Sequence, residues 1–358
     1  MRILNYVDSN ELSFRIPWIG LMKELERRGT EQVLLCRPGG NMEQAARVYG
    51  VPIRTWAPVF PSAPFLNCGY PSVAREIAPD IVLTRLSSAA AIAGFWGKRL
   101  GIPTVAMLDK ESKAKYFRNA DHYVSCSRWI KDAMASRGIP EDRIDVVHNS
   151  IDPERYARDS VVREEFRKSL GISSDEKVFV GIGMFNPEKS FDILVRAFFA
   201  AAGRRDDIRL LLVGDGPLRP SYLKLIDKLG VSGRVVVSEG FVDDVRPWLW
   251  GADYYVMPSS KEGFGIAALE AIAAGLPMIV SNTGGLLDIV ADGESCIMAE
   301  AGNADSFAKA MLTILDMDEA SIGRMLSGSM SRLSYFTNEA LADRMIGVYR
   351  SVLDRRLR

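Results

Sequence analysis

The chain has 358 residues, which is long for one compact domain and predicts two. Hydrophobic residues make up 47% and charged residues 25%, a balance that excludes a disordered or fibrous protein. The formal net charge is +0 and no dense basic stripe is present, so we expect no nucleic acid among the partners. The first half is mildly basic, which is compatible with an anionic acceptor or a membrane surface and equally with scattered surface charge.

The chain contains four cysteines: Cys36, Cys68, Cys126 and Cys296. None has the spacing of a metal site or a redox pair, which is typical of a reducing cytoplasm. The first residues show no basic-then-apolar signal pattern. The apolar stretch Gly263–Val280 carries Glu270, so it predicts a helix, a turn and a strand rather than a membrane span. We therefore expect a cytoplasmic protein, with peripheral contact at the inner face of the membrane as a further option.

Short aliphatic runs alternate with helical patterns along the chain. The runs in the first half are Ile3–Val7, Gln32–Cys36, Asp80–Thr84, Thr104–Leu108, Tyr123–Ser125 and Asp145–Val147. The runs in the second half are Val178–Gly181, Arg209–Val213, Val235–Ser238, Tyr254–Met257 and Met278–Ser281. The helical patterns between them are Arg15–Arg28, Arg128–Arg137, Phe191–Ala201, Leu218–Leu229 and Ile266–Ala274. Strands that are apolar on both faces are typical of parallel sheets covered by helices, so the alternation predicts doubly wound α/β units.

The series divides near residues 149–162, where turn residues are followed by a charged stretch. We predict an N-terminal Rossmann-like domain over residues 1–155 and a C-terminal one over residues 156–336. The amphipathic helix within about 337–358 is expected to pack back on the first domain. Sheets of this kind bind ligands beyond the carboxyl ends of their strands, so two facing domains would enclose one cleft.

A strand that ends in Gly181 and Gly183 leads to Lys189 at the start of a helix. Glycines let a ligand approach the backbone, and amides at a helix start attract phosphate. A plain strand-to-helix turn with a solvated lysine is an equal alternative. Asn186 stands where a dinucleotide fingerprint needs its third glycine, which argues against a nicotinamide dehydrogenase.

Two further turns are rich in glycine. Gly214 and Gly216 flank Asp215 after a strand, and we expect a role in shape for the glycines and plain turn chemistry for the aspartate. The turn Thr283-Gly284-Gly285 either lines the same cleft or simply begins a helix.

A loop carrying Glu262 and two glycines follows the run that ends at Met257. The glycines leave the amides of Gly265 and Ile266 able to face a phosphate. Glu270 lies about one turn inside an apolar helix, where a carboxylate must be paired or hydrogen-bonded. Ribose hydroxyls would serve as partners, and so would an arginine or backbone amides.

These segments resemble the retaining nucleotide-sugar glycosyltransferases of family four, which share the GT-B architecture of two facing Rossmann-like domains. The resemblance covers nearly the whole chain. Val147-His148-Asn149-Ser150-Ile151-Asp152 is similar to the motif P-N-G-[VI]-D, the Lys189 segment to G-R-L-x-x-x-K-G, and Gly214-Asp215-Gly216-Pro217 to G-x-G-P. The most specific feature is the pair of glutamates just described, which have seven residues between them.

The resemblance implies a role for each matching position. Glu262 and Lys189 would be catalytic, with Glu262 at the transferred sugar and Lys189 at the distal phosphate. Glu270 would hold the ribose hydroxyls, and the backbone near Phe241 and Val242 would border the base. The implied donor-binding set is Gly183, Gly214, Gly216, Phe241, Val242, Gly263, Phe264, Gly265, Ile266 and Glu270.

The implied activity is a retaining transfer of a hexose-type sugar from a UDP-sugar or GDP-sugar to a glycan or lipid-linked acceptor, in polysaccharide or lipopolysaccharide synthesis. No cofactor and no metal are expected, because a lysine and a helix terminus can stabilise the leaving diphosphate. Met184 replaces the arginine of the family motif, and Met107-Leu108-Asp109-Lys110 lacks a histidine that the family often has. These departures keep open the alternative of a non-catalytic nucleotide-sugar-binding protein descended from such an enzyme. A sugar-nucleotide epimerase of similar two-domain shape is a further alternative, against which the two histidines argue, because neither lies at a motif position.

Overall fold

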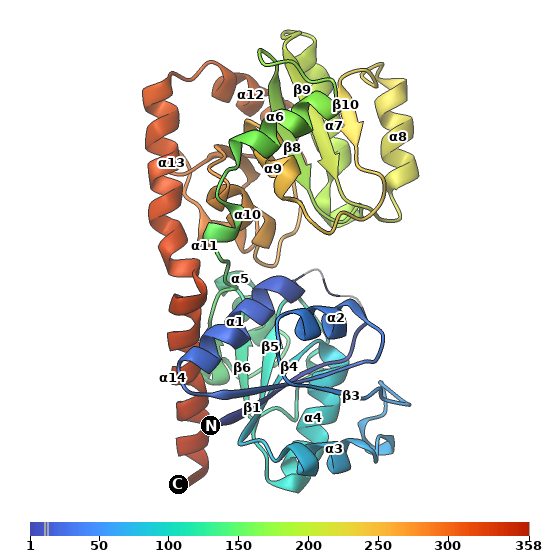
Figure 1. The fold of residues 1–358 in the computed structure, drawn as a ribbon, viewed down its shortest axis with the longest axis vertical. Coiled ribbons are helices and arrows are strands. Elements are labelled where there is room, and N and C mark those ends of the chain that lie inside the picture. Colours follow the sequence, from blue (N-terminus) through green and yellow to red (C-terminus); the bar gives the residue numbers. More distant parts are fainter. Residues whose placement is uncertain (11, 13, 358) are drawn as a thin grey trace. The chain divides into compact units, whose positions relative to one another are not determined.

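The structure is a computed structural model that describes residues 1–10, 12 and 14–357. It forms two compact units, Met1–Asp152 with Tyr335–Arg358, and Pro153–Ser334. Each unit is built on one sheet with helices on it (Figure 1).

The first unit contains a seven-stranded parallel sheet of order β3-β2-β1-β4-β5-β6-β7. Its strands are β1 (Arg2–Val7), β2 (Glu31–Cys36), β3 (Ile53–Thr55), β4 (Ile81–Arg85), β5 (Thr104–Leu108), β6 (His122–Ser125) and β7 (Ile144–Val146). Its helices are α1 (Arg15–Arg27), α2 (Asn41–Val48), α3 (Tyr70–Ile77), α4 (Ser87–Leu100), α5 (Arg128–Ala135) and α14 (Asn338–Leu357). Short 3-10 turns are η1 (Pro64–Leu66), η2 (Ala114–Tyr116) and η3 (Glu141–Arg143).

Successive residues of these strands face opposite sides of the sheet. Ile3 and Ile81 belong to a core cluster that includes residues of α1, α2 and α14. Their neighbours Leu4 and Val82 belong to a second cluster with residues of α3 and α4. Both faces of the sheet are therefore buried, which explains why its strands are continuously apolar.

The C-terminal helix α14 is part of the first unit. Met345 and Tyr349 are fully buried in the same cluster as α1. Arg28, which follows α1, forms an ion pair with Asp343 at 3.0 Å. This burial places the end of the chain in the same core as its beginning.

The second unit contains a six-stranded parallel sheet of order β10-β9-β8-β11-β12-β13. Its strands are β8 (Lys177–Ile182), β9 (Ile208–Val213), β10 (Val235–Val237), β11 (Tyr254–Met257), β12 (Met278–Ser281) and β13 (Ile297–Ala299). Its helices are α6 (Ser160–Ser169), α7 (Phe191–Ala202), α8 (Arg219–Lys228), α9 (Arg246–Gly251), α10 (Ile266–Ala273), α11 (Leu286–Ile289), α12 (Ala304–Leu315) and α13 (Glu319–Leu333). The turns η4 (Glu154–Tyr156) and η5 (Pro187–Lys189) also belong to it, and η6 (Ser334–Phe336) follows α13.

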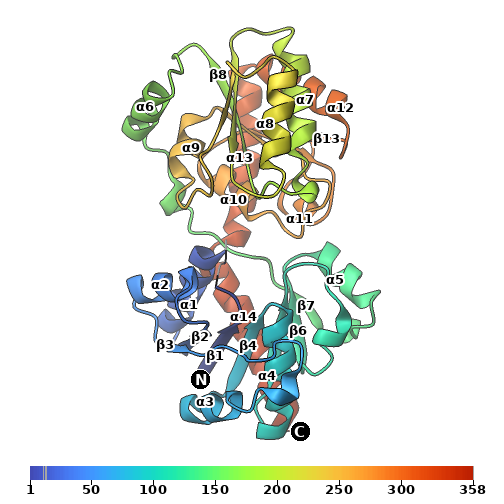
Figure 2. The ribbon, with the colours of Figure 1, turned by 90° about the vertical axis from the view of Figure 1, so that its right-hand side faces the viewer.

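Helices cover both faces of this sheet as well. Residues of α7, α8 and α12 form one core cluster with alternate residues of β8 and β9, such as Phe179 and Leu210. Figure 2 shows α9 and α10 on the opposite side of the sheet from α7 and α8.

The segment entering the second unit is held by arginines. Arg167 of α6 donates to the carbonyl oxygens of Ser173 and Glu176 at 2.6 Å, and its guanidinium pairs with Asp253 at 3.2 Å. Arg163 pairs with the same carboxylate at 2.7 Å. These two arginines therefore attach α6 to Asp253, the residue that precedes β11.

The predicted fold class is confirmed: both units are doubly wound α/β folds. The sequence prediction missed the strands β3 and β13, which have three residues each. It also did not single out the alanine-rich helix α4 or the helices α2, α3, α6, α9, α11, α12 and α13. Among the described helices, none is long and apolar enough to cross a bilayer.

Candidate functional site

The strand order of the second unit has a switch point between β8 and β11. The chain runs from β8 outward to β9 and β10, and then returns to place β11 on the other side of β8. In doubly wound sheets, ligands generally bind at such a switch point, outside the carboxyl ends of the strands. Lys189 lies in the loop after β8, and Glu262 lies in the loop after β11.

The loop after β8 is shaped by local hydrogen bonds. The Asn186 side chain accepts from the backbone amide of Lys189 at 3.1 Å and begins η5. Ser190 takes a left-handed conformation at φ 51° and starts α7. Lys189 thus ends a 3-10 turn two residues before the helix, rather than opening the helix itself. The backbone oxygen of Glu188 accepts from the amide of Ser260 at 2.9 Å, which ties this loop to the loop after β11.

The two loops also meet through their charges. The ammonium of Lys189 donates to Glu262 Oε2 in a short ion pair, and the hydroxyl of Ser259 lies 3.3 Å from the same oxygen. The side chains of Lys189 and Glu262 are 23% and 10% exposed. The structure therefore brings together the two residues expected to be catalytic.

Glycines of the third loop allow this arrangement. Gly284 has φ +57°, and a Cβ there would lie 2.2 Å from the carbonyl oxygen of Glu262. A Cβ on Gly285 would lie 2.2 Å from the carbonyl oxygen of Gly263. The Gly285 amide donates to the Glu262 carbonyl at 2.8 Å. The turn after β12 thus packs directly on the backbone of the Glu262 loop. A residue larger than glycine does not fit at position 284 or 285.

Gly214 and Gly216 have a similar supporting role. Both have positive φ, and a Cβ on Gly214 would lie 2.0 Å from the carbonyl oxygen of Gly183. A Cβ on Gly216 would lie 2.6 Å from the carbonyl oxygen of Phe185. The two glycines permit the turn after β9 to pack on the Lys189 loop, in keeping with the role in shape expected for them.

Helix α10 begins next to Glu262. Gly265 precedes it at φ +106°, and no described side chain caps its first turn. Amides at the first turn of a helix have no partner within the helix, so they are available to an anion. Gly265 and Ile266, whose amides were expected to hold the diphosphate, lie at this start of the helix, and Gly263 and Phe264 precede them in the loop.

Glu270 lies on the second turn of α10 and has a partner that the sequence did not reveal. The phenol of Tyr156 donates to Glu270 Oε1 at 2.8 Å. Burial raises the pKa of Glu270 to about 7, and the hydrogen bond from Tyr156 opposes this rise. The Trp250 indole donates to the backbone oxygen of Tyr156 at 2.9 Å and holds this turn in place.

Tyr255 on β11 adds a further buried phenol near both glutamates. It is fully buried, and its hydroxyl has no hydrogen-bond partner among the described residues. Burial raises its pKa well above the ordinary value, with smaller contributions from the charges of Glu270 and Glu262. Neither Tyr156 nor Tyr255 belongs to a motif, so only long-range contacts could identify them.

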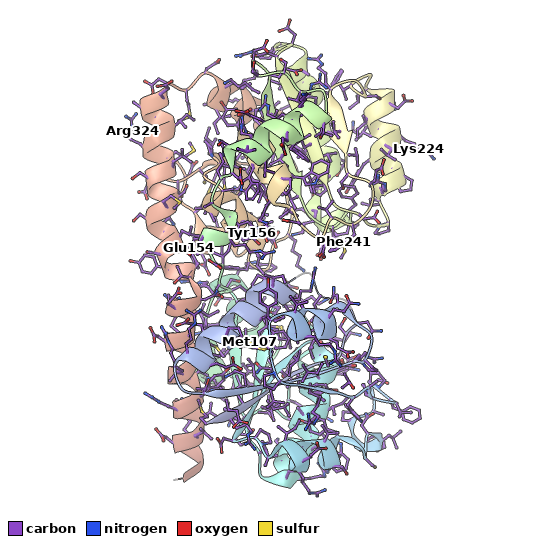
Figure 3. All side chains as sticks on the ribbon, viewed as in Figure 1. Met107, Glu154, Tyr156, Lys224, Phe241 and Arg324 are labelled. Carbon is purple, nitrogen blue, oxygen red and sulfur yellow. The ribbon has the colours of Figure 1, made fainter. Side chains whose placement is uncertain are left out.

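The proposed base-bordering residues lie in the loop after β10. Phe241 is 63% exposed, and Val242 is partly exposed. Figure 3 shows Phe241 and Tyr156 toward the same end of the second unit. Met184, which replaces the arginine of the family motif, is 60% exposed in the loop after β8.

The first unit also gathers charges at its switch point, between β1 and β4. Arg85 at the end of β4 is 3% exposed and contacts Asp109 Oδ1 and Asn149 Oδ1, each at 3.2 Å. Its guanidinium lies 4.7 Å from the centre of the Phe14 ring. The other oxygen of Asp109 is buried and has no hydrogen-bond partner among the described residues. The sequence analysis did not single out Arg85, because it lies in no motif.

The described residues include no group of three or more His, Cys, Asp or Glu side chains arranged to hold a metal ion.

Both units match known families. Residues 176–317 match the family "Glycosyl transferases group 1". Residues 18–155 match "Glycosyltransferase Family 4". Each unit of the chain is thus similar to a glycosyltransferase family, over these residues. The match over residues 18–155 ends three residues into the second unit, and the other match lies wholly within that unit.

Curated relatives agree with this assignment. The chain is 29% identical over 335 residues to the lipopolysaccharide core biosynthesis glycosyltransferase LpsE of Rhizobium meliloti, covering 91% of this chain and 92% of the relative. It is 30% identical over 214 residues to the N-acetyl-alpha-D-glucosaminyl L-malate synthase of Bacillus anthracis, covering 60% of this chain and 55% of that protein. It is 30% identical over 243 residues to the D-inositol 3-phosphate glycosyltransferase of Corynebacterium glutamicum, covering 64% and 57%. These last two matches span little more than half of each relative.

Solved structures share the fold. HepE of Anabaena in complex with UDP and glucose has a TM-score of 0.86 at 19% identity, covering 98% of this chain and 100% of the neighbour. A glycosyltransferase from Rickettsia africae has a TM-score of 0.82 at 16% identity, covering 98% of both chains. The chain therefore has the GT-B fold of these neighbours.

Proposed function

We propose that this protein is a retaining glycosyltransferase that moves a hexose-type sugar from a nucleoside-diphosphate sugar. One observation carries the proposal: the Lys189–Glu262 pair and the uncapped start of α10 lie together outside the carboxyl ends of β8 and β11. A cation, helix amides and a buried carboxylate at one switch point suit a ligand with a diphosphate and a sugar.

In the proposed reaction, an oxygen of the acceptor forms a bond to the anomeric carbon while the bond from that carbon to the diphosphate breaks. The electron pair of the broken bond stays on the leaving phosphate oxygen. Attack comes from the face on which the diphosphate leaves, so the acceptor's proton passes to that oxygen and the configuration is retained. Lys189 and the first amides of α10 stabilise the developing negative charge. They do so without a metal ion, and we propose no cofactor.

Two carboxylates divide the recognition of the donor. Glu262 accepts from hydroxyl groups of the transferred sugar. Glu270 accepts from the ribose hydroxyls, and Tyr156 orients it through their 2.8 Å hydrogen bond. Phe241 and Val242 border the base. A UDP-sugar or GDP-sugar is the proposed donor, and the UDP and UDP-glucose bound to HepE support a uridine nucleotide.

We further propose a glycan or lipid-linked acceptor of the cell envelope. The support is the relative LpsE, which is named for lipopolysaccharide core biosynthesis and matches nearly the whole chain. Buried Arg85 and partly exposed Asp109, at the switch point of the first unit, offer polar contacts to acceptor hydroxyls.

A surface of the first unit suits peripheral contact with an anionic membrane. Val59, Phe60, Phe65 and Leu66 are between 47% and 74% exposed, and we call them the apolar patch. The ring of Phe65 lies 6.5 Å from that of Phe95 on α4.

Basic residues continue this surface along α4. The Arg99 guanidinium lies 3.6 Å from the centre of the Phe95 ring, and Lys98 Nζ lies 3.5 Å from Asn119 Oδ1. Lys113 precedes η2 and Lys115 lies in it, and both are exposed. The turn η2 contacts α4. Apolar side chains beside exposed cations are suited to an anionic lipid surface.

A thermal-shift screen tests the donor site. UDP or GDP should raise the melting temperature, and NAD should not, because the Lys189 loop lacks a dinucleotide fingerprint. A ligand at a hundred times its dissociation constant stabilises by about 2.7 kcal/mol, which such a screen detects easily. The absence of a shift with any nucleoside diphosphate at millimolar concentration would refute the donor site. If the protein binds the nucleotide sugar but neither transfers the sugar nor hydrolyses the donor, it is a non-catalytic binding protein.

A further inference from the structure

We infer that Glu262 makes the site discriminate against its own product, by repelling the nucleoside diphosphate once the sugar has left. The inference rests on the proposed function and extends it to the release of product. It concerns the charge of Glu262, whereas the proposed role in catalysis concerns its contact with the sugar.

The observation behind it is the neutralisation of Lys189. Among the described residues, Glu262 is the one acid within ion-pair distance of Lys189. The Glu262 residue is 8% exposed, so solvent screens its charge weakly. A phosphate that approaches Lys189 must therefore also approach the carboxylate of Glu262.

When the intact donor is bound, the repulsion between its distal phosphate and the carboxylate of Glu262 is small. The distal phosphate is esterified by the sugar and carries one negative charge. Hydroxyl groups of the sugar donate to Glu262 and compensate for the loss of its contact with Lys189.

After transfer, the balance changes. The acceptor oxygen now holds the anomeric carbon, and the leaving phosphate oxygen holds the electron pair of the broken bond. When the acceptor's proton has passed on to solvent, the terminal phosphate has one more negative charge than in the donor. The sugar hydroxyls are gone, so the carboxylate of Glu262 faces that charge directly. Two like charges that both lie beside Lys189 repel each other, and the burial of Glu262 leaves this repulsion weakly screened.

The experiment compares Glu262→Gln with Glu188→Gln. Glu188 lies next to Lys189 in the chain, and its side chain is exposed. Both changes remove one negative charge, but only the first removes it from the ion pair. Isothermal titration of each variant with UDP and with UDP-glucose gives two dissociation constants and their ratio. GDP and GDP-glucose replace them if the wild type binds guanosine nucleotides.

We expect Glu262→Gln to bind the nucleoside diphosphate at least about tenfold more tightly, with a smaller change for the nucleotide sugar. The ratio of the two dissociation constants should stay at the wild-type value in Glu188→Gln. Glu262→Asp, which keeps the charge, should keep weak product binding. If Glu262→Gln does not fold, Glu262→Ala removes the same charge and is measured instead.

Two failures can be told apart. If the wild type binds no nucleoside diphosphate, the proposed function fails. If the wild type binds it and removal of the Glu262 charge tightens both ligands equally or neither, the product-release role is overturned and the donor site stands.

Discussion

The ammonium of Lys189 and the carboxylate of Glu262 form an ion pair that joins the loops after β8 and β11. The pair spans 73 positions of the chain and lies at the switch point of the second sheet. Because both side chains are mostly buried, neither charge can be removed without consequence for the other. The pair therefore links the stability of the site to its chemistry.

Lys189→Ala should lower the turnover number by roughly two orders of magnitude, because the leaving phosphate gains charge as the bond breaks. Donor affinity should fall less. The variant should also lose about 1–3 kcal/mol of stability, because the carboxylate of Glu262 is left without its cation. Steady-state kinetics, donor titration and chemical unfolding measure the three effects.

Lys224→Ala is the matched control, because Lys224 is exposed on α8 of the same unit (Figure 3). It should change neither turnover nor stability appreciably. The double variant of Lys189→Ala with Glu262→Gln should recover stability without recovering turnover. A folded Lys189→Ala variant with near-normal turnover would remove the lysine from the site.

Glu270 should make stability and nucleotide binding depend on pH. Its pKa is raised from the ordinary 4.5 to about 7, chiefly by burial. The folded state therefore binds the proton more tightly than the unfolded state. The resulting stabilisation is complete below about pH 4.5 and is lost as pH rises through 7. It amounts to at most about 3 kcal/mol, and less where water reaches the partly buried side chain.

Urea unfolding of the wild type and Glu270→Gln between pH 5 and pH 8 measures this effect, with Glu188→Gln as the control. The variant should gain stability relative to the wild type as pH rises. Affinity for the nucleoside diphosphate should increase from pH 6 to pH 8 in the wild type, because the ribose hydroxyls need an ionised acceptor, and not in Glu270→Gln. Parallel pH profiles for the two proteins would contradict the assignment.

Gly284→Ala should impair the site through the backbone of Glu262. Its Cβ would lie 2.2 Å from the Glu262 carbonyl oxygen, so the loop must shift. Gly293→Ala is the control, because Gly293 has a similar positive φ of +72° and open space around it. Both variants should lose about 1 kcal/mol from backbone strain. Only Gly284→Ala should lose further stability from the clash with the Glu262 carbonyl oxygen, and only this variant should lose turnover severalfold. Equal turnover in both would show that the turn after β12 does not position Glu262.

Arg167→Met should destabilise the second unit by about 2 kcal/mol or more without altering turnover per folded molecule. The change leaves the carbonyl oxygens of Ser173 and Glu176 without their buried donor. Lys168→Met, at the exposed next position, should have little effect. Chemical unfolding and activity at equal folded concentration separate these outcomes, and equal stability of the two variants would show that the arginine contacts contribute nothing.

The apolar patch should bind anionic vesicles. Phe60→Ser combined with Phe65→Ser should reduce cosedimentation with phosphatidylglycerol vesicles severalfold, because two exposed aromatic side chains can no longer enter the interface. Val48→Ser is the control, because Val48 is 80% exposed and lies on α2, outside the patch. Equal binding by both variants, or equal binding to neutral vesicles, would exclude this surface.

The sequence by itself determined the class of each unit and the position of the main motifs along the chain. A continuous apolar run of strand length indicates a strand that is buried on both faces. Most strands of both sheets were therefore predicted. The strands β3 and β13 were missed because three residues are too few to show a period and, unlike the equally short β10, neither is a continuous β-branched run. Helix α4 was missed because its middle is apolar on all sides and shows no amphipathic pattern.

Only the tertiary structure decided which of these residues meet. Glu262 and Lys189 were singled out from local patterns, but their ion pair follows from β8 and β11 being neighbours in the sheet. Tyr156 reaches Glu270 across 114 positions, and no sequence pattern marks either partner for the other. Local periodicity records whether a side chain is buried. Its neighbours depend on strand order and loop packing, which are properties of the whole unit.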